Sequence, residues 1–192
     1  QSCWEILAIQ CEFNIRAGHL GLAYVSHDMG GFCCGKQMIR ENPDGAAIID
    51  PVLYTRWLQF GVFNPVLRFH SAPGAGSRQP WDYAGLDKGA CKHWLRVRNS
   101  LLPYVYAAAR EHYETGLPLV RGLFLDDPAN QDAYRFDQFL FGPDLLVAPM
   151  LTAENQRRIT LPAGDWWTFE GRRRMEGGRT FTRRVGLRQI PV

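Results

Sequence analysis

The sequence predicts two structural units in series, an α/β segment with parallel strands and then an antiparallel β domain. Up to Gly116, amphipathic helical patterns alternate with short apolar runs. After Gly116, short β-type runs recur about every 8–12 residues between Asp-Pro, Gly-Pro and Gly-Gly turns. The composition, 46% hydrophobic and 21% charged over 192 residues, is that of a globular protein and excludes disorder. We therefore divide the chain into residues 1–116 and 117–192.

The first half opens with a predicted helix and a predicted strand. Apolar side chains recur on one helical face over residues 3–16. Residues 22–25 are an apolar run bounded by glycine, which is typical of a parallel strand buried on both faces. Because Gln1 opens the chain almost inside the helical pattern, we expect that its beginning is missing.

A loop, a helix and a second short strand follow. Residues 33–49 are irregular and contain glycine and proline, which predicts a loop. Asp50 as N-cap and Pro51 as first residue predict a helix that ends at Asn64. Residues 66–70 then form the second predicted strand.

A surface loop and a long helical region complete this half. Residues 71–87 are rich in proline and glycine and predict the loop. Within residues 88–115, Pro103 either kinks one helix or lies in the first turn of a second helix capped by Ser100. Gly116 ends the helical region. The strands predicted after it cover residues 119–125, 136–141, 145–147, 158–161 and 166–169.

Polar residues follow both predicted parallel strands, His27 and Asp28 after the first and Arg68 and His70 after the second. In an α/β barrel, ligand-handling residues lie at these carboxyl ends. A carboxylate, a guanidinium and an imidazole suit a polyhydroxylated ligand, because together they accept and donate hydrogen bonds. Periodicity alone leaves a structural interpretation open, in which Asp28 caps a helix, Arg68 pairs with it and His70 is a core histidine.

Seven motifs cover nearly the whole chain. They are S-H-D-M-G-G-F (26–32), L-Y-T-R-W-L-Q-F-G-V-F-N-P (53–65), R-F-H (68–70), R-Q-P-W (78–81), L-L-P-Y (101–104), F-G-P-D-L-L-V-A-P (141–149) and L-P-A-G-D-W-W (161–167). In this order they resemble the motifs of glycoside hydrolase family 31. The resemblance implies the C-terminal portion of a TIM-type α/β barrel, followed by an all-β sandwich domain.

The same resemblance implies a retaining, exo-acting α-glycosidase, with an α-glucosidase that hydrolyses terminal α-linked glucose as the leading interpretation. Asp28 and His70 would grip the terminal sugar, Arg68 would position neighbouring carboxylates, and Phe32 and Trp57 would shape the pocket wall. Both catalytic carboxylates are expected upstream of the first residue, so this segment holds no catalytic residue. The implied partners are a small carbohydrate and the missing N-terminal part of the same enzyme, with no metal or organic cofactor.

Two other classes of function remain as alternatives. One is a complete, non-catalytic carbohydrate-binding or interaction protein. The other is a nucleic-acid binder that uses the arginines between Arg172 and Arg184. It ranks last because Glu170 and Glu176 dilute that cluster and the net charge of +3 is evenly spread along the chain.

The cysteines and the apolar runs indicate the compartment in which the protein works and whether it spans a membrane. A metal site of Cys33, Cys34 and His27 is conceivable, but the five cysteines lack the spacing of a zinc site. Reduced structural thiols are favoured, and they favour a cytoplasmic setting. No apolar run approaches the ~20 residues that a membrane span needs, so no membrane partner is expected.

Overall fold

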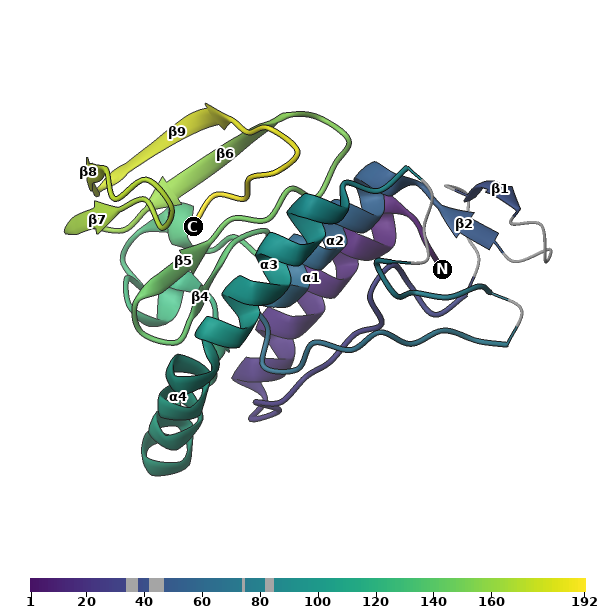
Figure 1. Cartoon of the computed structure of the whole chain (residues 1–192). Coiled ribbons are helices and arrows are strands. Elements are labelled where there is room, and N and C mark those ends of the chain that lie inside the picture. Colours follow the sequence, from purple (N-terminus) through teal and green to yellow (C-terminus); the bar gives the residue numbers. More distant parts are fainter. Residues whose placement is uncertain (34–37, 42–46, 74, 82–84) are drawn as a thin grey trace.

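A computed structural model describes residues 1–33, 38–41, 47–73, 75–81 and 85–192 (Figure 1). The helices of the described chain all precede Gly116. They are Trp4–His19 (α1), Pro51–Val62 (α2), Lys88–Ser100 (α3) and Leu102–Thr115 (α4). Helix α2 packs against α3, and α1 contacts the β region that follows the helices.

The residues after Gly116 form small antiparallel sheets, as predicted. Their strands are Val120–Arg121 (β3), Phe139–Phe141 (β4), Leu145–Val147 (β5), Gln156–Leu161 (β6), Asp165–Trp167 (β7), Arg174–Glu176 (β8) and Arg179–Arg184 (β9). Strands β3, β4 and β5 make one sheet, while β6 pairs with β9 and β7 with β8. Two 3-10 turns, Leu123–Leu125 and Gln131–Ala133, lie between β3 and β4. The prediction missed β8 and β9, and it was wrong for residues 123–125, which form a 3-10 turn rather than part of a strand.

The two parallel strands predicted at residues 22–25 and 66–70 do not form, so that prediction was wrong. Leu22 and Tyr24 are each 59% exposed. The parallel pairing of the described chain is confined to one isolated bridge between Asp28 and Arg68. A strand buried on both faces needs neighbouring strands and covering layers, and the described residues supply only this bridge.

The predicted loop at residues 33–49 was also wrong in part. It contains an antiparallel hairpin of Met38–Glu41 (β1) and Ala47–Ile49 (β2). Figure 1 shows this hairpin at the opposite end of the molecule from β7 and β8. The glycines and the proline that indicated a loop, Gly35, Pro43 and Gly45, lie outside the described residues.

The helix boundaries follow the predicted signals closely. The Asp50 carboxylate accepts hydrogen bonds from the backbone N–H groups of Val52 and Leu53, at 2.6 and 3.2 Å, which confirms the N-cap. Pro103 lies in the first turn of a second helix, as one alternative predicted. Ser100 is not its cap, because it is the last residue of α3. Gly116 ends α4 with φ +78°, a conformation that glycine adopts readily.

One hydrophobic core joins the helices to the β region. Its fully buried side chains include Leu7, Leu53, Phe60, Trp94, Phe139, Phe141 and Val147. A smaller cluster lies beneath the β6–β9 pair. Burial of these apolar side chains contributes on the order of 1.5–3 kcal/mol each, so the two halves stabilise one another.

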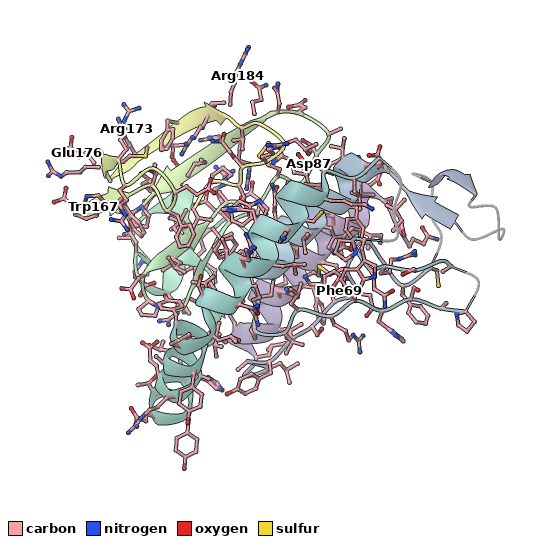
Figure 2. The ribbon with its side chains drawn as sticks, in the orientation of Figure 1. Phe69, Asp87, Trp167, Arg173, Glu176 and Arg184 are labelled. Atoms are coloured by element: carbon pink, nitrogen blue, oxygen red, sulfur yellow. The ribbon has the colours of Figure 1, made fainter. Side chains whose placement is uncertain are left out.

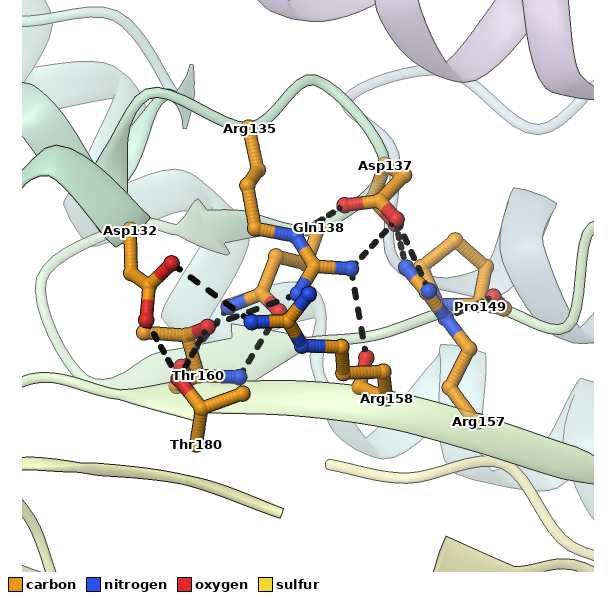
Figure 3. Close-up of polar contacts among 9 residues, drawn as sticks. All are labelled: Asp132, Arg135, Asp137, Gln138, Pro149, Arg157, Arg158, Thr160 and Thr180. Atoms are coloured by element: carbon orange, nitrogen blue, oxygen red, sulfur yellow. Dashed lines mark hydrogen bonds and ion pairs between the residues drawn. The ribbon is translucent and has the colours of Figure 1, made fainter. Parts of the chain in front are cut away.

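Salt bridges fasten β6 to the segment before β4 (Figure 3). Asp137 accepts hydrogen bonds from Arg135 at 2.6 Å and from Arg157 at 2.8 Å. Burial acts to raise the pKa of Asp137, but the two arginines outweigh it and lower the pKa to about 2. Beside them, the amide of Gln138 pairs with the backbone of Thr160 through two hydrogen bonds.

Candidate functional site

A cavity of about 240 Å³ lies beside the bridge between Asp28 and Arg68. Its walls come from α1, from the segment before β1, from α2 and from Arg68. The lining residues are Gln1, Ile6, Gln10, Ser26, His27, Asp28, Gly31, Phe32, Trp57 and Arg68. The remaining predicted residue, His70, contacts Phe32, with the ring centroids 5.6 Å apart. The structure thus brings the predicted site residues together.

Arg68 fixes the carboxylate of Asp28. Its Nε and Nη2 atoms both donate to Oδ1 of Asp28, at 2.9 and 2.6 Å. The second oxygen, Oδ2, has no hydrogen-bond partner among the described residues and is free to accept one. The structural alternative, in which Arg68 pairs with Asp28, is therefore right about this pair. It is wrong about His70, which is exposed, and about Asp28, which caps no helix.

A Gly30-Gly31 turn carries the chain from Asp28 to Phe32. Both glycines have positive φ, +76° and +87°. A Cβ atom on Gly31 would lie 2.5 Å from the carbonyl oxygen of Gln1, so only glycine fits. The buried hydroxyl of Ser2 contacts the carbonyl oxygen of Gly30 at 2.5 Å and helps to hold the turn. The turn leaves Phe32 44% exposed beside the cavity.

His27, which follows the first predicted strand but was given no role in sugar binding, also lines the cavity. Its ring stacks on Phe60, with centroids 4.7 Å apart, and its Nδ1 accepts a hydrogen bond of 3.0 Å from Nε1 of Trp57. Burial lowers the pKa of His27 to about 3, so the ring is neutral and its proton is on Nε2. The sequence carries no signal that the indole of Trp57 faces this imidazole.

Two buried polar atoms of the cavity residues lack partners in the described chain. They are Nε2 of His27 and Oγ of Ser26. An unsatisfied buried donor costs about 1–3 kcal/mol, so such a site favours a polar ligand or solvent that completes these hydrogen bonds. Trp57 is 1% exposed and its N–H already serves His27, so its ring contributes only wall area.

The conceivable metal site is not supported by the described residues. No cluster of three His, Cys, Asp or Glu side chains suits a metal ion in the part of the chain that the structure describes, and Cys34 lies outside that part. Cys3, Cys11 and Cys91 are buried free thiols. Burial raises the pKa of Cys91 to about 11, which makes it a packing residue rather than a nucleophile.

The sequence profile of the glycosyl hydrolases family 31 TIM-barrel domain matches residues 1–108. The profile of the glycosyl hydrolase family 31 C-terminal domain matches residues 116–192. The chain belongs to glycoside hydrolase family 31. The predicted resemblance is confirmed, as is the C-terminal part of the family's barrel followed by the C-terminal domain.

Family 31 relatives cover this chain almost completely. Alpha-glucosidase 2 of Bacillus thermoamyloliquefaciens is 32% identical over 100% of this chain and 23% of its own length. An alpha-xylosidase of Saccharolobus solfataricus is 31% identical over 98% of this chain and 25% of its own. The chain thus spans about a quarter of the length of the curated relatives it matches.

Solved family 31 structures share the fold. The dextranase of Flavobacterium johnsoniae, complexed with isomaltotriose, has a TM-score of 0.86 and 31% identity, over 98% of this chain and 22% of its own. An alpha-xylosidase from a soil metagenome, complexed with xylose, also has a TM-score of 0.86, with 30% identity over 100% of this chain and 30% of its own. No helix in the described part of this chain is long and apolar enough to cross a membrane.

Proposed function

We propose that this chain is the C-terminal part of a retaining, exo-acting α-glycosidase, an α-glucosidase that hydrolyses terminal α-linked glucose. The observation that carries the proposal is the cavity that Asp28, Phe32 and Arg68 line in a family 31 chain. The α-glucosidase among its relatives supports the sugar preference, and the α-xylosidases define the main competitor.

Each predicted site residue has a role that its geometry allows. Oδ2 of Asp28 accepts hydrogen bonds from sugar hydroxyls while Arg68 holds Oδ1 in place. His70 is exposed beside Phe32 and both donates to and accepts from the sugar. Phe32 and Trp57 form apolar wall. Contacts of this kind accelerate hydrolysis to the extent that they strengthen in the transition state.

The catalytic carboxylates of the proposed enzyme come from its N-terminal part. Retaining hydrolysis needs two carboxyl groups about 5–5.5 Å apart. Asp28 is the one carboxylate among the described lining residues, and Arg68 already binds it. This segment therefore supplies sugar-binding groups and neither the nucleophile nor the acid/base.

The proposal includes a division of the chain at Gly116. Residues 1–116 are the last units of the barrel, and residues 117–192 are a β-sandwich-type domain. The left-handed Gly116 at the end of α4 and the antiparallel sheets after it support this division.

Activity and sugar binding test the proposal. The chain alone should not hydrolyse an aryl α-glucoside, and turnover above blank would show that it contains the catalytic groups after all. In an NMR titration, glucose should shift the indole N–H signal of Trp57 more than xylose does. Asp28→Asn should weaken this response, whereas Asp126→Asn, at an exposed site, should not. A stronger response to xylose would favour an α-xylosidase.

The alternative, a non-catalytic carbohydrate-binding protein, would use the same cavity, whose described lining holds one carboxylate, that of Asp28. The complete enzyme implied by our proposal separates the two. There, His70→Ala should lower kcat/KM for an α-glucoside by about 100-fold, equivalent to about 2.7 kcal/mol of transition-state binding. An unchanged kcat/KM would remove His70 from the sugar site.

A further inference from the structure

A second cavity of about 240 Å³ lies between β8 and β9 and shares no lining residue with the first. Four arginines dominate its walls, and two threonine hydroxyls accompany them. These six residues are Arg173, Arg174, Arg179, Arg183, Thr168 and Thr182. We call this cavity the arginine groove.

Strand geometry explains the arrangement. Arg179, Phe181 and Arg183 alternate along β9 and therefore share one face of the β6–β9 pair. Arg173 and Arg174 come from the turn and strand of the β7–β8 hairpin. Figure 2 shows Arg173 projecting from that end of the molecule. Arginines from the β7–β8 hairpin and from β9 therefore line the same groove.

Three arginines of the groove lack an ion-pair partner. Arg174 donates to Asp165 at 2.7 Å, but Arg173, Arg179 and Arg183 have no carboxylate partner among the described residues. Six arginines and one glutamate lie within residues 172–184. Elsewhere in the chain, carboxylates such as Asp137 neutralise arginines, as Figure 3 shows. Positive charges gathered without counter-charges repel one another and attract anions.

We infer that the arginine groove binds the sulfate, phosphate or carboxylate group of an acidic oligosaccharide. Guanidinium groups bind such oxyanions through two parallel hydrogen bonds. Oγ1 of Thr168 accepts a hydrogen bond from the backbone of Arg173, so its O–H remains able to donate to a sugar hydroxyl. This site is independent of the sugar preference proposed for the first cavity.

The aromatic content of the groove argues against single-stranded nucleic acid. Binding of single strands relies on exposed aromatic faces on which bases stack. Phe181 is the aromatic side chain of the groove, and the guanidinium of Arg179 lies over its ring, 5.4 Å from the centroid. The lining of the groove therefore offers charge and hydroxyl groups, and Arg179 covers its one aromatic ring, while Trp167, 57% exposed, lies outside this lining.

Calorimetric titration of the full chain tests this assignment. A heparin-derived sulfated tetrasaccharide should bind, and its affinity should fall between 50 and 200 mM salt, because the contacts are ionic. Neutral maltotetraose should not bind at the groove. Arg179→Gln combined with Arg183→Gln should lower the affinity for the sulfated sugar at least tenfold.

A control pair of surface substitutions distinguishes binding in the arginine groove from nonspecific attraction by surface charge. Arg96→Gln combined with Arg110→Gln removes the same charge outside the groove and should change the affinity less than twofold. Equal losses in the two double variants would overturn the assignment, as would tighter binding of a single-stranded DNA 10-mer than of the sulfated sugar. Thermal melting of each variant shows that it is folded before the titration is interpreted.

Discussion

Two consecutive residues of α2 serve opposite parts of the molecule. Trp57 donates its indole N–H to His27 beside the first cavity. Arg56 donates to the carbonyl oxygens of Gln189 at 2.5 Å and Val185 at 3.2 Å, in the C-terminal segment. Successive helical residues project about 100° apart, so one turn of helix reaches both regions. The family motif of residues 53–65 therefore contributes to the first cavity through Trp57 and holds the C-terminal segment through Arg56.

Helix α2 thus has two faces that differ in charge. We call the face with Trp57 the site face and the face with Arg56 and Gln59 the attachment face. On the attachment face, Gln59 accepts a hydrogen bond from Arg56 and donates to the carbonyl oxygen of Leu187 at 2.8 Å. Burial lowers the pKa of Arg56 to about 10, so its guanidinium remains charged at neutral pH. On the site face, His27 and Trp57 are neutral. We therefore expect the attachment face of α2 to depend on one buried cation and its site face on the hydrogen bond between two neutral rings, Trp57 and His27.

The largest effect expected from this comparison is the loss of Arg56. Arg56→Ala should lower the free energy of unfolding by about 3 kcal/mol, because it removes the donor from the buried carbonyl oxygen of Val185 and from the partly buried carbonyl oxygen of Gln189. Urea denaturation measures this change. Arg56→Lys keeps the charge but not the two-pronged geometry, so an intermediate loss is expected. A loss as small as that of the exposed control Arg96→Ala would show that the attachment contributes little.

The pH dependence of stability tests the site face of α2, through His27. The pKa of His27 is lowered by burial, so between about pH 6.5 and pH 3 the unfolded chain binds a proton that the folded chain does not. Stability is therefore complete above pH 6.5 and falls as the pH drops, by about 2 kcal/mol from pH 7 to pH 5. Asp137 affects stability only nearer pH 4 and below. The urea concentration at the midpoint of unfolding, measured at pH 7, 6 and 5, tests this effect.

His27→Gln is the variant that assigns this pH dependence. It removes the titrating ring, so the fall in stability between pH 7 and pH 5 should be much smaller than in the unmodified chain. An unchanged fall would mean that another group carries it. The comparison uses the slope with pH rather than absolute stability, so a general loss from the substitution does not obscure the result.

The helices were predictable because each makes its hydrogen bonds within its own segment. Asp50, Pro51 and Gly116 stand at helix ends where local rules place them. Residues 22–25 satisfy the pattern of a strand, yet strand formation depends on partners that no local pattern supplies. Strand β9 was missed for another reason, because Phe181 is the one apolar side chain among its six residues and gives no apolar periodicity.

Part of the lining of the candidate cavity was predictable, but its internal contacts were not. The resemblance identified Asp28, Phe32 and Arg68, and the structure brings them to one cavity. The pairing of Trp57 with His27 depends on how α2 packs, which spacing along the chain does not determine. For the same reason, the neighbouring Arg56 gave no sign that it faces the C-terminal segment.

A milder change separates the site face from the attachment face. Trp57→Phe keeps most of the buried ring but removes the N–H, so Nδ1 of His27 loses its donor. We expect a loss of about 1–2 kcal/mol and a change in the tautomer of His27 visible by NMR. Hydrogen exchange at residues 185–189 should be unaffected. Faster exchange there would show that the two faces of α2 are coupled.

The smallest effect concerns the helix that carries both faces. Asp50→Ala removes the acceptor for the N–H groups of Val52 and Leu53 and should cost about 1 kcal/mol. Asp50→Asn keeps an acceptor and should cost less. Because the cap precedes both Arg56 and Trp57, Asp50→Ala should raise hydrogen exchange near His27 and in residues 185–189 to similar extents. A change confined to one of these regions would mean that the two faces are held independently of the first turn of α2.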